Sequence, residues 1–330
     1  MDAADLFGRS PVQPAHVAED LHTLATRIGP RIRLGTSSWN FPGWTGLVWQ
    51  DDCAESLLSR QGLAAYAAHP LLRTVSLDRA FYRPLSAADY ARYAAQVPDG
   101  FRLVVKAPAL VTDALVRNES GQGMQPNPAF LDPDTAWAAC AQPLIDGLGD
   151  RLGVLVLQVS PLPARWTSQQ GRVFIEALAP LLQRLSALRA ALPQAHVALE
   201  VRNPELIAKP LADVLKAHGA LYCLGLHAKM PPIDAQLPML RTLWPGPLVC
   251  RWSLHSRHGA YGYASAKAQY APFNRLVDPD PHTRETLAKV MAATAAAGFD
   301  VYVTINNTAE GSAPLSVVEL ARAAAARIPI

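Results

Sequence analysis

The chain has 330 residues, of which 50% are hydrophobic, and a formal net charge of +3. The apolar content is enough to bury one large core, and the small charge does not predict a nucleic-acid partner. No apolar run reaches the roughly 18 residues that a membrane span needs. The four cysteines form no CxxC motif, and the sequence opens without a signal-peptide pattern, so we expect a soluble, cytoplasmic protein.

Residues 1–30 are interpreted as an N-terminal extension. Three prolines, Pro11, Pro14 and Pro30, flank a short helical pattern that contains Leu21 and Leu24. This segment either packs across the bottom of the following domain or is mobile. The domain itself is expected to span residues 31–330.

From residue 31 onward, short apolar runs alternate with longer helical patterns. Most of these runs are almost continuously apolar, which is typical of parallel strands buried on both faces. Eight strand–helix units predict an α/β fold, a (β/α)8 TIM barrel with a closed parallel sheet. The alternative, a doubly wound dinucleotide-binding sheet, lacks a GxGxxG motif after its first strand. The predicted strands are residues 32–36, 74–77, 101–105, 153–159, 196–201, 220–224, 248–252 and 301–305.

Helical patterns fill the gaps between the predicted strands. The clearest follows Thr167, a candidate N-cap, and repeats apolar residues at spacings of three and four. Ser86 and Asp89 have the spacing of a capping box, while Gly219 and Gly298 are placed to end helices. The pattern at 230–244 is the weakest because it contains three prolines. The other predicted helices are residues 54–68, 87–96, 135–148, 206–217, 283–297 and 315–328.

The predicted strands end in polar residues, and long connections at 37–52, 107–134 and 253–282 follow strands rather than helices. Barrels build their sites at the carboxyl ends of strands, so these residues should meet at one mouth. Any strand must end in something polar, so each residue alone is a weak indication. Together they predict a pocket for an anion or a polyol, formed by Lys106, Glu200, Arg202, Arg251, Asn306 and Asn307.

An ordered set of short segments resembles the YecE-like family, also called domain of unknown function seventy-two. The resemblance runs from about Arg31 to near the end of the chain. It implies a TIM barrel, but the activity of the family is unsettled, so it supplies no reaction. The segments that carry it are Gly-Thr-Ser-Ser-Trp at 35–39, Phe-Tyr-Arg-Pro at 81–84, Lys-Ala-Pro at 106–108, Leu-Glu-Val-Arg-Asn-Pro at 199–204 and Ile-Asn-Asn-Thr at 305–308.

The chain departs from the family pattern at two strand ends. Ser76 stands where the family usually has a Glu, which puts in doubt any activity that needs this carboxylate. On the seventh strand the family pattern is close to Arg-Phe-His-Gly, whereas Arg251 is here followed by Trp-Ser-Leu and then His255. The family's strand-end residues that do carry over by position are Trp39, Tyr82, Lys106, Glu200, Arg202 and Asn307.

Lys106 and Glu200 are the candidate catalytic residues. A lysine at a barrel mouth can bind phosphate or, if desolvated, form a Schiff base. A carboxylate beside it would raise its pKa, so we expect Lys106 to stay charged. Glu200 is either a general acid or base, or only the ion-pair partner of Lys106 or Arg202.

His227, His255, Glu200 and Asp78 end four different strands and are residue types that bind metals. Because no HxH, HxxxH or HExxH spacing occurs, no metal is predicted, and the cofactor is left open. The aromatic residues of connection 37–52 could stack on bases or sugars, although packing as a lid is favoured. The tyrosines of connection 253–282 fit a lid over the mouth or an oligomer contact equally well.

Three functions fit these residues. The first is an enzyme or former enzyme that binds a small polar or phosphorylated ligand at the mouth. In this enzyme, Lys106, Arg202 and Arg251 would bind the negative charge of the ligand, while Asn306 and Asn307 would bind its hydroxyl groups. The second, not favoured, is a nucleic-acid binding or processing protein resembling barrel-type apurinic endonucleases, and the third is a binding protein without catalysis. The remaining candidate ligand contacts are Trp39, Tyr82 and His255.

Overall fold

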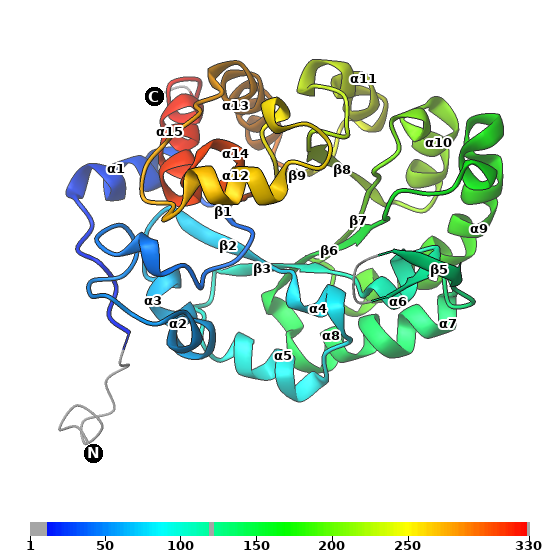
Figure 1. Ribbon diagram of the computed structural model, residues 1–330, viewed down its shortest axis with the longest axis horizontal. Coiled ribbons are helices and arrows are strands. Elements are labelled where there is room, and N and C mark those ends of the chain that lie inside the picture. The colour runs from blue at the N-terminus through cyan, green and yellow to red at the C-terminus, as the bar shows by residue number, and fades with distance from the viewer. Residues whose placement is uncertain (1–11, 119–121, 329–330) are drawn as a thin grey trace.

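Eight parallel strands close into a barrel in the computed structural model, which describes residues 12–118 and 122–328 (Figure 1). The order around the barrel is β1-β10-β9-β8-β7-β6-β3-β2, and β1 closes the ring by pairing with both β2 and β10. The predicted (β/α)8 TIM barrel is therefore confirmed. The strands are β1 (Ile32–Thr36), β2 (Leu72–Leu77), β3 (Arg102–Lys106), β6 (Leu152–Gln158), β7 (His196–Glu200), β8 (Leu221–Leu226), β9 (Leu248–Trp252) and β10 (Val301–Ile305).

Helices surround this barrel (Figure 1). The capping box predicted at Ser86 and Asp89 is present, and Gly219 and Gly298 adopt positive φ at 62° and 86°. The segment with three prolines forms α11 despite Pro238 inside it. The main helices are α2 (Glu55–Gln61), α3 (Leu63–Ala67), α5 (Ala87–Ala94), α8 (Gln142–Gly147), α9 (Ala164–Ala191), α10 (Lys209–Ala217), α11 (Ile233–Leu243), α13 (Pro281–Ala296) and α15 (Ala313–Ala325).

The start of α9 differs from the prediction. The helix begins at Ala164, and a kink of non-helical backbone interrupts it from Ser168 to Gly171. Thr167 therefore lies within the first turns and does not cap the apolar repeat, which starts only after the kink. Gly171 has a φ of 77° and lies so close to Leu206 that a Cβ would approach its side chain to 2.4 Å, so both the backbone and the packing favour glycine.

The strand-to-helix connections carry short elements that the sequence patterns did not predict. A two-stranded antiparallel hairpin forms in connection 107–134, with too few residues per strand to show an alternating pattern. Short helices also form in the strand-to-helix connections. These elements are β4 (Leu115–Arg117), β5 (Gly123–Pro126), α4 (Arg79–Tyr82), α6 (Ala109–Thr112), α7 (Pro133–Ala136), α12 (Tyr263–Tyr270) and α14 (Asn307–Glu310).

The described part of the N-terminal extension packs on the barrel. Helix α1 (Glu19–Ile28) lies beside α15 (Figure 1), and Arg27 Nε donates a hydrogen bond to the Ala325 carbonyl at 3.1 Å. Arg73, at the start of β2, donates to the Ala25 carbonyl at 2.8 Å. These contacts fix α1 at the amino-terminal end of the barrel, as one of the two predicted arrangements requires. Residues 1–11 lie outside the described residues.

The interior of the barrel explains which residues reach the mouth. Side chains alternate between the two faces of a strand, so inward-facing residues lie two positions apart. A small buried cluster, separate from the larger core under the helices, fills the middle of the barrel; it consists of Val104, Val154, Val156, Ala198, Cys223, Val249 and Tyr302. Two positions beyond four of its members, towards the carboxyl ends of the strands, come Lys106, Gln158, Glu200 and Arg251.

Among the helices of the described residues, none combines the length and the apolarity that crossing a bilayer would take.

Candidate functional site

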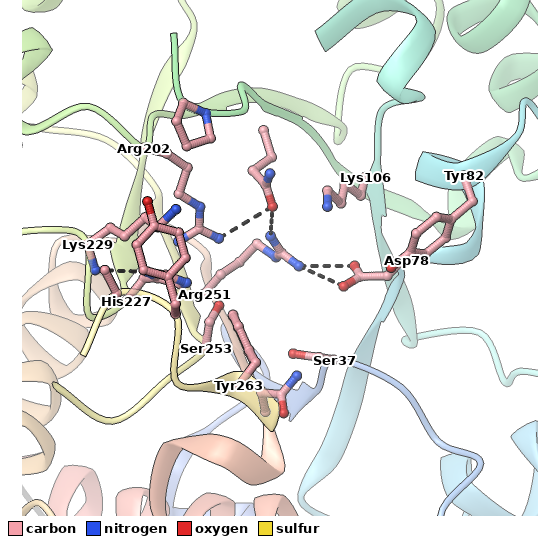
Figure 2. A pocket seen from close by; sticks show the side chains of 15 residues that line it. Ser37, Asp78, Tyr82, Lys106, Arg202, His227, Lys229, Arg251, Ser253 and Tyr263 are labelled. Atoms are coloured by element: carbon pink, nitrogen blue, oxygen red, sulfur yellow. Dashed lines mark hydrogen bonds and ion pairs between the residues drawn. The ribbon is translucent and has the colours of Figure 1, made fainter. Parts of the chain in front are cut away.

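A cavity of about 520 Å³ opens at the carboxyl ends of the strands (Figure 2). Its volume lies in the range of small-molecule sites. Residues far apart in the sequence line it because ring closure brings their strand ends together. The lining residues are Ser37, Asp78, Tyr82, Lys106, Gln158, Pro161, Arg202, His227, Lys229, Arg251, Ser253, Ala260, Tyr261, Tyr263 and Asn306.

Arg251 is the centre of a buried ion-pair network. Its Nη1 donates to Glu200 Oε2 at 2.7 Å, and its Nη2 donates to both carboxylate oxygens of Asp78 at 3.0 and 2.9 Å (Figure 2 draws the Asp78 pair). Ser76 donates to Asp78 at 2.6 Å. Burial alone would lower the pKa of Arg251, but the carboxylates of Asp78 and Glu200 outweigh it and hold this pKa above its usual value. Asp78 thus supplies a carboxylate at the end of β2, two residues after the Ser76 that replaces the family's Glu.

Glu200 is fully buried beneath the cavity and holds a second arginine. Its Oε1 forms an ion pair with Arg202 Nη2 at 2.6 Å, although the geometry of this pair is not that of a hydrogen bond. Burial would raise the pKa of Glu200, but Arg202 and Arg251 outweigh it and hold the pKa below its usual value. Gln158 Oε1 accepts from both guanidinium groups at 3.3 and 3.4 Å. A buried, ionised carboxylate therefore fixes two arginines at the mouth.

Lys106 lies on the cavity wall. Its Nζ stands 3.4 Å from the centroid of the Phe81 ring, and within residues 12–118 and 122–328 it makes no hydrogen bond or ion pair. Burial lowers its pKa to about 7, with Asp78 and Glu200 acting against this and Arg251 and Arg202 adding to it. The neighbouring carboxylates of Asp78 and Glu200 do raise the pKa of Lys106, as expected, but burial outweighs them, so Lys106 is not held fully charged near pH 7.

His227 and Lys229 extend the site along the end of β8. The Lys229 backbone N–H donates to His227 Nδ1 at 2.9 Å, which leaves the proton of the neutral ring on Nε2. Burial, aided by Arg202, lowers the pKa of His227 to about 4, so the ring is neutral at physiological pH. The Lys229 ammonium lies 4.2 Å from the ring centroid of Tyr261, which is 88% exposed.

Of the predicted site residues, the structure brings five to the cavity wall: Tyr82, Lys106, Arg202, Arg251 and Asn306. Glu200 lies directly below them. Asn306 has a second task, since its Oδ1 caps α14 by accepting from Thr308 N at 3.1 Å.

Trp39, Asn307 and His255 do not line the cavity. The Trp39 indole donates to the Leu58 carbonyl at 3.0 Å, and its ring packs against Tyr93 in the core. Asn307 Oδ1 accepts from Ala313 N at 2.8 Å and from the Trp44 indole at 3.2 Å, which ties the first connection to the end of β10. The side chain of His255 caps the short turn that follows it by accepting from Arg257 N.

The aromatic residues of connection 37–52 are packing residues. Trp44 and Trp49 are fully buried, and Trp49 Nε1 donates to the Phe41 carbonyl at 2.9 Å. Phe41 in turn packs against Phe273 of the seventh connection. The favoured interpretation, a packed cover rather than a surface for bases, therefore agrees with the structure.

Sequence reasoning missed Lys229, and it left Tyr261 and Tyr263, which line the cavity, open between a lid over the mouth and an oligomer contact. Lys229 lies three residues beyond β8, outside the strand-end positions, and only the fold brings it beside the seventh connection. Ser37, Gln158 and Asp78 were recognisable as polar strand ends. Because side chains alternate along a strand, Gln158, two residues after the apolar Val156, could have been predicted to face the mouth.

No group of three or more His, Cys, Asp or Glu side chains suited to a metal ion occurs within the described ranges of the chain. His227, Glu200 and Asp78 are indeed at the mouth, but the carboxylates face arginines.

The fold is shared with solved structures of distant proteins. One is a DUF72 family protein from Enterococcus faecalis V583, with 17% identity, a TM-score of 0.57 and coverage of 89% of this chain and 95% of that one. Another is a DUF72 family protein from Thermotoga maritima MSB8, with 19% identity, a TM-score of 0.57 and coverage of 88% and 98%. Comparison with curated proteins finds no match. The model of the family described as protein of unknown function DUF72 matches residues 33–329, so the chain belongs to this family of TIM-barrel proteins.

Proposed function

We propose that the chain binds a small anionic ligand, one that carries a carboxylate or phosphate group, in the cavity at the barrel mouth. The observation that carries this proposal is the charge of the cavity. Among the described residues that line the cavity or lie directly beneath it, four have cationic side chains, Lys106, Arg202, Lys229 and Arg251, and two have carboxylates, Asp78 and Glu200. Even with Lys106 partly neutral, positive charge is in excess in a partly desolvated space, where electrostatic attraction is strong.

The arginines are in place before a ligand arrives. Glu200 holds Arg202 and Arg251 from below, and the Nη1 atom of Arg202 is buried with no hydrogen-bond partner among the described residues. A preorganised guanidinium group loses little conformational entropy on binding, and its planar donors match a carboxylate or a phosphate. This supports Glu200 as a positioning residue, with Lys106 as the group that is free to exchange a proton with a ligand.

Titration calorimetry with inorganic phosphate tests the proposal. The wild-type chain should bind phosphate, and Lys229→Ala should weaken binding by about fivefold to tenfold, the equivalent of roughly 1 kcal/mol. Lys289→Ala is the matched control, because Lys289 is an exposed lysine on α13 at the other end of the barrel. Equal affinities for the two variants and the wild type, or no phosphate binding at all, would refute the proposal.

A further inference from the structure

Lys106 has the environment of a nucleophile rather than of a charge that merely binds. Lys106 lines the cavity. Among the described residues, its Nζ contacts the face of the Phe81 ring, 3.4 Å from the ring centroid. Only about 8% of the residue is exposed. An amine on this wall lies within reach of a ligand in the cavity.

The arginines beside Lys106 explain why neither Asp78 nor Glu200 forms an ion pair with it. Both oxygens of Asp78 accept from Arg251, and both oxygens of Glu200 face Arg202 and Arg251. The arginines therefore take the negative charge that would otherwise hold an ammonium. Burial then favours the neutral amine, and the pKa of Lys106 falls to about 7.

We infer that Lys106 forms an imine with an aldehyde or ketone whose other end carries a carboxylate or phosphate, an inference that rests on the proposed function. The cavity separates the two roles. Figure 2 shows the guanidinium groups of Arg202 and Arg251 between Lys106 and Lys229, so an anionic group can be bound by these cations while a carbonyl carbon reaches Nζ. Arginine would serve for binding alone, but only lysine can lose its proton and attack.

The step balances with water as its only by-product. The lone pair of the neutral Nζ forms a bond to the carbonyl carbon, and one amine proton passes to the carbonyl oxygen to give a carbinolamine. A second proton, from solvent, converts the hydroxyl into water, which leaves. The product is a protonated imine, so no oxidant or reductant is needed.

Reductive trapping tests this inference on the full-length wild-type chain. Glyoxylate is the probe because it joins an aldehyde to a carboxylate, and cyanoborohydride at pH 7 reduces any imine to a stable carboxymethyl-lysine. Peptide mass spectrometry should locate the adduct on Lys106, about tenfold or more ahead of Lys289, since burial lowers the pKa of Lys106 from 10.5 to about 7. Glycolaldehyde, an aldehyde without the carboxylate, should lose most of this preference, and saturating phosphate should suppress the adduct.

Lys106→Arg is the matched variant, because arginine cannot form an imine. It should show no adduct at position 106. If phosphate binds the wild type but the adducts spread evenly over the lysines, the imine is refuted while the binding proposal stands. If phosphate does not bind, both fail. The wild-type peptide map decides the matter even where the variant does not fold.

Discussion

Inward-facing side chains have opposite roles at the two ends of the barrel. At the amino-terminal end, the Tyr302 ring fills the interior, with the Arg33 guanidinium 5.3 Å from its centroid and His196 packed against its edge. At the carboxyl end, the corresponding positions carry Lys106 and Arg251, and a cavity stays open. The closed end serves stability, whereas the open end keeps buried charges that stability alone would not select.

Removing Arg251 should produce the largest effect. Arg251→Met leaves Glu200 and Asp78 without their partner, and loss of one member of a buried ion pair costs about 3–5 kcal/mol. Arg33→Met, at the closed end, should cost less, about 1–2 kcal/mol, since Arg33 pairs only with Asp300 among the described residues and the side chain of Asp300 is 24% exposed, so water can reach the carboxylate that is left. Urea unfolding measures both free energies. A loss at Arg33 as large as that at Arg251 would remove the distinction between the two ends.

Filling space at the closed end should affect stability but not binding. A Cβ at Gly153 would lie 2.7 Å from the Tyr302 ring, so Gly153→Ala should lower the free energy of unfolding by about 1–3 kcal/mol. Phosphate affinity should stay at the wild-type value. Gly100→Ala is the control, because nothing lies within 4 Å of a Cβ there. A Gly153→Ala variant with weakened phosphate binding would show that the ends are coupled.

Lys106→Met should raise stability slightly while weakening binding. The folded state lowers the pKa of Lys106 from 10.5 to about 7, so folding disfavours the protonated form. The penalty is complete below pH 7 and disappears as the pH rises towards 10.5, because above that value the amine is neutral in both states. We expect the substitution to raise the free energy of unfolding by about 1–2 kcal/mol at pH 7 and by less at pH 9, as measured by urea unfolding. A gain that does not change with pH would contradict this reasoning.

The barrel was predictable because each strand is a short apolar run that ends in a polar residue. The site was only partly predictable. Lys106, Arg202 and Arg251 follow from their strand-end positions, but sequence cannot show that Glu200 pairs with arginines and leaves Lys106 without a partner. That pairing depends on the distances across the barrel mouth.

Two other site residues show the same limit. Trp39 and Asn307 also lie beside strand ends. However, Trp39 is hydrogen-bonded to Leu58 and Asn307 to Ala313, so both have structural roles away from the cavity. Lys229 had no strand-end signal, because its approach to Tyr261 depends on how the seventh connection folds over β8.

The titration of the Lys106 amine tests the central claim most directly. Heteronuclear NMR of a chain with isotope-labelled lysine side chains, assigned with Lys106→Arg, gives its pKa with and without phosphate. We expect a midpoint near pH 7 in the free protein, which should rise when phosphate binds, because a nearby anion favours the ammonium form. A midpoint near 10.5 that phosphate does not move would contradict the account.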